Sequence, residues 1–413
     1  MFENAVITRA GVERQVDLGL VAETIFFYQS VQLVLNRGSI AALATKIPAN
    51  DLIELLDRPE LKLSYMHPAF GVVSTGLPRV HDFGAFTFAG TQEKKAPNYQ
   101  DEIAVVLERA LGKNKQTKRL VKALTDRVTL HRFKETAEKE KIIPDLARAD
   151  VSDDGFVQAA VIRVLQYLLP SFKPSPDFRF KLFNTGQGYA VDTTLNFTDL
   201  NKIYHQSVSP SHSSLSSEYL LAHIIDARLD TYFAAYYMAE IITAPIYSDL
   251  IQLKHFDFLL RRQANIRELG LFSDAMLNDA PSLREVINSG ERNISDFLKL
   301  LDQAERFREW LRNANADAGI VRNYYRSAIE KTWADKLPTK SIRFVVATGL
   351  GILADIMVPT GLGTVAGVAV GAADNFYLDR LLKGWRPNQF IEGPYREFIS
   401  SKPLADKQAR RVG

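Results

Sequence analysis

Three residues near the middle of the chain have types and a spacing suited to metal or acid–base chemistry. His223, Asp226 and Asp230 stand at positions i, i+3 and i+7, so a helix there would place them on one side. Imidazole and carboxylate groups bind divalent metal ions, and His205 or His212 in the preceding serine-rich loop could complete the coordination shell. A carboxylate could equally orient a histidine for general acid–base catalysis.

The stretch that carries these residues, 215–243, has the pattern of a long central helix. Apolar side chains occupy most of its circumference, which predicts that it is buried in the core. Buried helices often carry a few polar side chains that pair with neighbours, and Arg228 could be the neighbour of the two aspartates. A structural role for these polar residues therefore stays open beside the metal and catalytic ones.

Two other histidines stand on either side of a turn. His67 and His81 flank the turn-forming residues Gly76 and Pro78 in a region of alternating, strand-like pattern. The two imidazoles could meet in space and act together, or they could be ordinary residues beside strands.

A basic segment, 112–134, contains eight basic residues and the single acid Asp126. Leucines recur on one face at helical spacing, which predicts a basic amphipathic helix. Such helices contact nucleic acid, anionic lipid or an acidic partner, although a solvated basic face is the simpler interpretation. The candidate basic patch consists of Lys113, Lys115, Lys118, Arg119 and Lys122.

The longest apolar stretch, 344–373, contains one charged residue, Asp355. Pro359 near its middle predicts two helices joined by a tight turn, because proline lacks the N–H that a helix interior needs. We expect this helical hairpin to span 340–383. Small residues would line its packing face, among them Gly349, Gly351, Gly363, Gly367 and Gly371.

Three interpretations of this hairpin compete. Each expected helix is shorter than the roughly 20 apolar residues that cross a bilayer, which favours a hairpin buried in a helical bundle. Insertion into a membrane after a trigger is the second, and in design alone it resembles the hidden hairpin of colicin-type pore-forming domains. The third is a dinucleotide-binding turn, since 349–354 and 361–366 both match G-x-G-x-x-A, but too little chain follows for a complete domain of that type.

The amino-acid composition limits the kinds of chemistry that the chain can carry out. The chain has 413 residues, a net charge of +3 and no cysteine, which excludes disulfides, thiolate metal sites and cysteine nucleophiles. The first residues lack the pattern of a secretory signal, so we expect a cytoplasmic protein that is peripheral to, or conditionally inserted in, the inner membrane.

Patterns along the chain predict a mainly helical α+β protein in three regions. Residues 1–98 are expected to form a small mixed sheet domain, and 99–290 a helical region with a β-hairpin near 178–195. Residues 291–413 are expected to form a helical bundle that contains the apolar hairpin, followed by aromatic residues that pack on the core and a basic tail.

Three classes of function follow from these features. The first is a non-enzymatic interaction or effector protein, which acts on membranes when its hairpin is released and associates with a protein partner or with itself. The second is a divalent-metal enzyme centred on His223, Asp226 and Asp230. The third is a nucleic-acid-binding protein that uses the basic segment. No motif in the sequence names a reaction.

Overall fold

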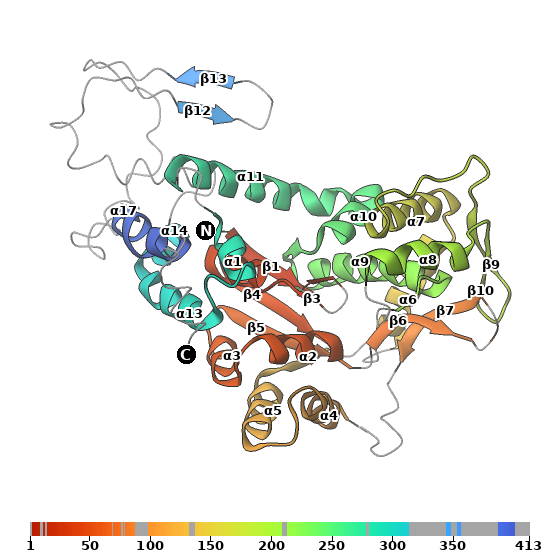
Figure 1. Ribbon diagram of the computed structural model, residues 1–413, viewed down its shortest axis with the longest axis horizontal. Helices are drawn as coiled ribbons and strands as arrows, with labels where there is room; N and C mark the ends of the chain where they lie inside the picture. The colour runs from red at the N-terminus through yellow and green to blue at the C-terminus, as the bar shows by residue number, and fades with distance from the viewer. Residues whose placement is uncertain are drawn as a thin grey trace.

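A computed structural model gives the fold, which is mainly helical with small parallel and antiparallel sheets, as predicted (Figure 1). The residues described are 2–8, 11–12, 15–67, 69–75, 77, 79–86, 98–131, 137–208, 213–277, 281–313, 344–347, 353–356 and 387–400.

A parallel sheet of five strands forms the centre of the molecule. Its order is β11-β1-β4-β5-β8, and every neighbouring pair is parallel. The strands are β1 (Phe2–Ile7), β4 (Tyr28–Leu35), β5 (Leu61–Met66), β8 (Thr129–His131) and β11 (Glu240–Ile242). A short antiparallel pair, β2 (Gly11–Val12) and β3 (Gln15–Val16), follows β1.

Helices cover both faces of this sheet, because successive strand residues point to opposite sides. In β4, Leu33 and Leu35 belong to one core cluster and Val34 to the other. The first cluster includes buried residues of α1 (Leu18–Phe27), α2 (Arg37–Lys46), α3 (Ala49–Leu56), α4 (Tyr99–Leu111) and α5 (Lys115–Arg127). The second includes buried residues of α6 (Ala137–Val151), α7 (Asp154–Leu168), α9 (Ser217–Tyr237) and α10 (Pro245–His255).

A second sheet is antiparallel, with the order β6-β7-β10-β9. The strands are β6 (Ala69–Ser74), β7 (Val80–Phe86), β9 (Phe180–Asn184) and β10 (Tyr189–Thr193). The hairpin expected near 178–195 is thus confirmed, with Gly186 in the left-handed region at its turn. Both sheets take strands from each side of residue 98, where the sequence suggested a boundary.

Residues 294–311 and 390–399 share a core cluster with the N-terminal helix α1. The ring of Phe26 in α1 lies 6.0 Å from that of Phe307 and 6.1 Å from that of Phe390, between centroids. The aromatic residues Phe390, Tyr395 and Phe398 are buried, as the sequence predicted for a segment that packs on the core. The elements are α13 (Ile294–Gln303), α14 (Glu305–Asn313), α17 (Pro387–Phe390), η2 (Ile391–Tyr395) and α18 (Arg396–Ile399).

The remaining helices are α8 (Phe197–Ser207), α11 (Asp257–Leu277) and α12 (Leu283–Asn288). The long helix expected over 215–243 ends earlier, at Tyr237. Met238 adopts a left-handed conformation with φ of 48°, and the β-branched residues Ile241 and Ile242 then continue as strand β11. The apolar pattern by itself did not separate the end of this helix from a short buried strand.

The apolar hairpin requires a correction. The structure has two antiparallel strands, β12 (Phe344–Ala347) and β13 (Leu353–Ile356), where the first helix of the hairpin was expected. Valines and isoleucines suit a strand better than a helix, which explains the difference. Asp355 pairs with Val345 across the two strands. Residues 357–386, with Gly363, Gly367 and Gly371, lie outside the described residues, as do Gly349 and Gly351.

The membrane hypothesis stays a prediction. Within the described ranges, we find no helix with the length and apolar character needed to span a bilayer.

Candidate functional site at the carboxyl edge of the parallel sheet

The strands of the parallel sheet all end at one edge, which we call the carboxyl edge. Strand β1 leads there into Thr8, β5 into His67, and β8 ends at His131. In open parallel α/β sheets, ligands bind outside the carboxyl ends of the strands. Side chains able to do chemistry are therefore expected at this edge.

An imidazole–carboxylate pair lies at the carboxyl end of β5. His67 Nδ1 is 2.8 Å from Glu102 Oε2. The backbone N–H of His67 also donates to the carbonyl oxygen of His131, at 3.3 Å, which holds His67 beside the end of β8. If Nδ1 donates to this carboxylate, Nε2 is the ring nitrogen left to exchange a proton.

Glu102 owes its position to the start of helix α4. Asn98 caps this helix by accepting a hydrogen bond from the N–H of Asp101, and Glu102 stands in the first turn. A carboxylate is favoured there by the positive end of the helix dipole. The side chain of Glu102 is 11% exposed, so the carboxylate acts in surroundings that are largely closed to water.

Arg37 and Tyr65 complete the cluster. Helix α2 begins directly after β4 with the capping box of Asn36 and Ser39, and it packs against α4. Its first residue, Arg37, has Nε 3.7 Å from Glu102 Oε1. Tyr65 near the end of β5 is buried, and burial together with the nearby charge of Glu102 raises the pKa of its phenol. One carboxylate thus stands among an imidazole, a guanidinium and a neutral phenol.

The arrangement resembles one part of a catalytic site, in which a general base is held in place by an orienting group. A carboxylate that holds one ring nitrogen fixes the tautomer and orientation of a histidine whose other nitrogen moves protons. We refer to His67, Glu102, Arg37 and Tyr65 as the carboxyl-edge cluster.

The predicted metal-binding residues lie elsewhere, on α9, where each meets other side chains. Asp230 is fully buried and accepts hydrogen bonds from the hydroxyls of Thr8 and Thr243, the latter at 2.6 Å. These threonines directly follow β1 and β11, so Asp230 ties together the ends of two neighbouring strands. A hydroxyl on each carboxylate oxygen is the arrangement of a structural carboxylate.

His223 and Asp226 share a different neighbour. The His223 ring lies 5.7 Å from the Tyr247 ring between centroids, and the Tyr247 hydroxyl donates to Asp226 at 3.4 Å. His205 lies on α8 with its Nε2 3.2 Å from the hydroxyl of Ser214. In the described ranges, no three histidine, aspartate or glutamate side chains are grouped as metal ligands.

His212, the other candidate ligand, lies outside the described residues. Arg228, the neighbour suggested for the two aspartates, instead forms a two-pronged ion pair with Asp150, with both N–O distances 2.6 Å. This pair joins α9 to α6.

His67 and His81 do not meet. His81 stands near the start of β7, paired with Ser74 at the end of β6, whereas His67 precedes β6. The two histidines therefore lie at opposite ends of the β6–β7 hairpin. The partner of His81 is instead Ser217 in the first turn of α9, with His81 Nε2 2.9 Å from the serine hydroxyl.

The His81–Ser217 pair predicts a dependence of stability on pH. Burial lowers the pKa of His81 below its usual 6.5, so the folded protein holds this ring neutral. The unfolded chain binds the proton more readily, and the stabilisation is complete above pH 6.5 and lost as the pH falls from there toward the lower folded pKa. We expect urea denaturation to give a lower unfolding free energy below pH 6.5 than at neutral pH. His81→Gln should reduce this difference, and an unchanged difference in that variant would contradict the assignment.

The predicted basic helix is confirmed over Lys115–Arg127, which is α5, but Thr129–His131 of the basic segment form strand β8 instead. The five candidate residues are all exposed. Its buried residues, among them Leu120 and Leu124, face the first core cluster.

Sequence reasoning missed Glu102, Arg37 and Tyr65 as neighbours of His67. A short strand followed by a histidine was visible, but 35 positions separate His67 from Glu102. The capping residue Asn98, with acidic residues three and four positions later, was the available signal for a carboxylate at a helix start.

Comparison with known proteins finds no family model, curated protein or solved structure that matches the chain.

Proposed function

We propose that this protein is an enzyme that transfers a proton to or from a small polar substrate at the carboxyl edge of its parallel sheet. The observation that carries the proposal is the 2.8 Å contact between His67 Nδ1 and Glu102. Its location supports a functional role, because the carboxyl ends of parallel strands are where α/β proteins bind ligands.

Each member of the carboxyl-edge cluster has a distinct role in this proposal. His67 Nε2 is the general base or acid. Glu102 is a positioning residue, which keeps the proton on Nδ1 and stabilises the imidazolium that forms when Nε2 accepts a proton. Arg37, whose side chain is 34% exposed, extends from the buried carboxylate toward the solvent and supplies positive charge for a polar substrate.

The proposal is tested by incubating the purified protein with a cell metabolite extract and following which metabolites are consumed or formed. We expect at least one conversion by the wild-type protein that is slowed roughly 10²- to 10⁴-fold by His67→Asn. Glu102→Gln should slow the same conversion and shift its pH profile, because it removes the charge that holds the Nδ1 proton.

A matched control is His205→Asn, since His205 lies on α8, outside the cluster, with its Nε2 3.2 Å from the hydroxyl of Ser214. This control should retain the wild-type rate. Absence of any conversion by the wild-type protein, or equal rates for wild type and His67→Asn, would reject the proposed function.

A further inference from the structure

The exposed side of α5 carries a concentrated positive charge that the proposed reaction does not use. We call Lys115, Lys118, Arg119 and Lys122 of α5, together with Lys113 just before the helix, the α5 basic face. All five side chains are exposed, and the one acid of the helix, Asp126, lies near its C-terminal end.

The chain itself neutralises little of this charge. Lys113 Nζ is 3.7 Å from Glu108, and Arg119 donates to the amide oxygen of Asn50 at 3.4 Å. Among the described residues, Lys115, Lys118 and Lys122 have no acidic partner within ion-pair distance. Because these lysines are three and four residues apart, their positive charges lie on the same side of the helix.

The other side of α5 fixes its orientation. Thr117, Leu120, Ala123 and Leu124 are buried, and the helix packs against α3 and α4. Asn114 caps the helix through the N–H of Thr117 at 2.8 Å. The basic face is therefore presented by a rigid helix whose apolar residues are already used in the core.

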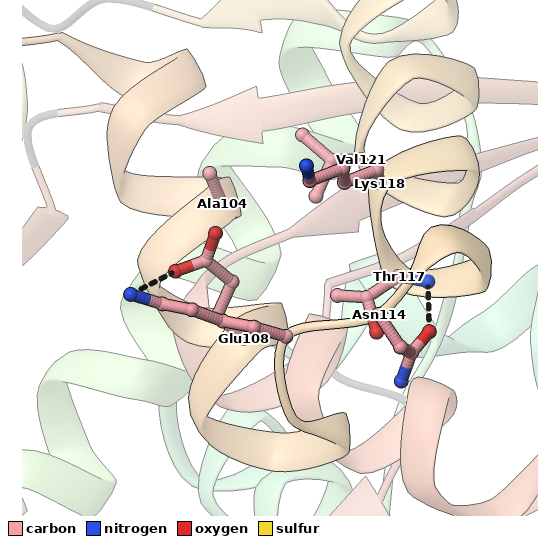
Figure 2. A pocket seen from close by; sticks show the side chains of 7 residues that line it. Ala104, Glu108, Asn114, Thr117, Lys118 and Val121 are labelled. Carbon is pink, nitrogen blue, oxygen red and sulfur yellow. Dashed lines mark hydrogen bonds and ion pairs between the residues drawn. The ribbon is translucent and has the colours of Figure 1, made fainter.

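A small hollow adjoins the basic face where α4 meets α5. Figure 2 shows Lys118 and Val121 of α5 across from Ala104 and Glu108 of α4. Lys113, which also lines the hollow, forms an ion pair with Glu108. The hollow's volume of about 130 Å³ is too small for a typical organic ligand, for which pockets span roughly 300 to 1,000 Å³. This surface thus suits contact with an extended anion better than enclosure of a small molecule.

We infer that the α5 basic face binds the phosphate backbone of a nucleic-acid duplex without sequence preference. Lys115 to Lys122 spans seven residues, or about 10 Å of helix, enough to reach more than one phosphate of a strand. Neither aromatic side chains that could stack on bases nor large apolar side chains that could enter a lipid layer are exposed on α5. The chemistry is therefore purely electrostatic, which favours phosphates in regular array over a membrane surface.

The test measures fluorescence anisotropy of a labelled random-sequence DNA duplex of about 30 bp titrated with the full-length protein. If the face neutralises about four phosphates, affinity should fall roughly 10²-fold between about 50 and 200 mM salt. Lys118→Glu with Lys122→Glu should weaken binding at least about 10-fold. The plot of log affinity against log salt concentration should become less steep, by an amount equivalent to about two phosphate contacts.

The matched control places the same two charge reversals elsewhere, at the exposed Lys173 and Lys299. It changes the net charge equally and should bind like the wild-type protein. Both variants should fold, since all four side chains are exposed. Circular dichroism checks this. Any of three results would overturn the inference: no binding of the duplex by the wild-type protein, equal weakening in both variants, or binding of phosphatidylserine vesicles without binding of the duplex.

Discussion

Gly19→Ala is expected to destabilise the protein by about 3 kcal/mol, or to prevent folding. A Cβ atom at Gly19 would lie 2.8 Å from the Cα and carbonyl carbon of Arg284, and closer still to its carbonyl oxygen. These are backbone atoms of α12, so no side-chain rotation relieves the overlap. The N–H of Gly19 also donates to Asn288 at 2.9 Å, which holds the two helices at this separation.

The matched control is Gly270→Ala in α11. This glycine is also helical, but its added Cβ would meet no atom within 4 Å. Because alanine favours helix over glycine, this change should be neutral or stabilising by up to about 1 kcal/mol. Urea denaturation of both variants separates the two cases. Equal stability of the two variants would show that α1 and α12 do not approach as closely as described.

Asp230→Ala is expected to cost roughly 3 to 5 kcal/mol of unfolding free energy. Two charge-assisted hydrogen bonds are lost, and the Thr8 hydroxyl is left buried without this acceptor. The effect should be large because Asp230 joins β1 to β11. Strands β4, β5 and β8 lie on one side of β1 in the sheet, and β11 lies on the other. Asp230→Asn, which keeps the size and one acceptor oxygen, should lose less.

Asp226→Asn serves as the comparison. Asp226 lies on the same helix but accepts a longer bond, 3.4 Å from the Tyr247 hydroxyl, and the change should cost no more than about 1 kcal/mol. Titration with a divalent metal separates the structural role from the metal-binding hypothesis. A metal that stabilises the wild-type protein but neither aspartate variant would contradict the structural assignment of Asp230.

Local sequence patterns predicted several elements closely. Asn293 and Asp296 form the capping box expected at the start of α13, and the turn at Asn184–Gln187 joins β9 to β10. These signals depend on residues within a few positions of one another, so they are present in any fold the chain adopts. The first helix of the hairpin expected over 340–383 was wrong, because an apolar run suits both a packed helix and a strand pair.

The candidate site was harder to predict because its members are distant in sequence. His67 was visible as a histidine after a strand, but its carboxylate partner depends on α4 crossing back over the sheet to meet α2. Strands β8 and β11 contain only three residues each, too few for a periodic pattern, and without them the parallel sheet has only its three longer strands.

The sequence by itself determined the helical character of the chain, the positions of most helices, the β9–β10 hairpin and the basic face of α5. Each follows from side-chain periodicity or from capping and turn residues, which act over a few residues. Only the tertiary structure decided the strand order, the return of the C-terminal segments to α1 and the meeting of His67 with Glu102. Those contacts join positions far apart in the chain, and they form because every helix and strand must bury its apolar face against another element.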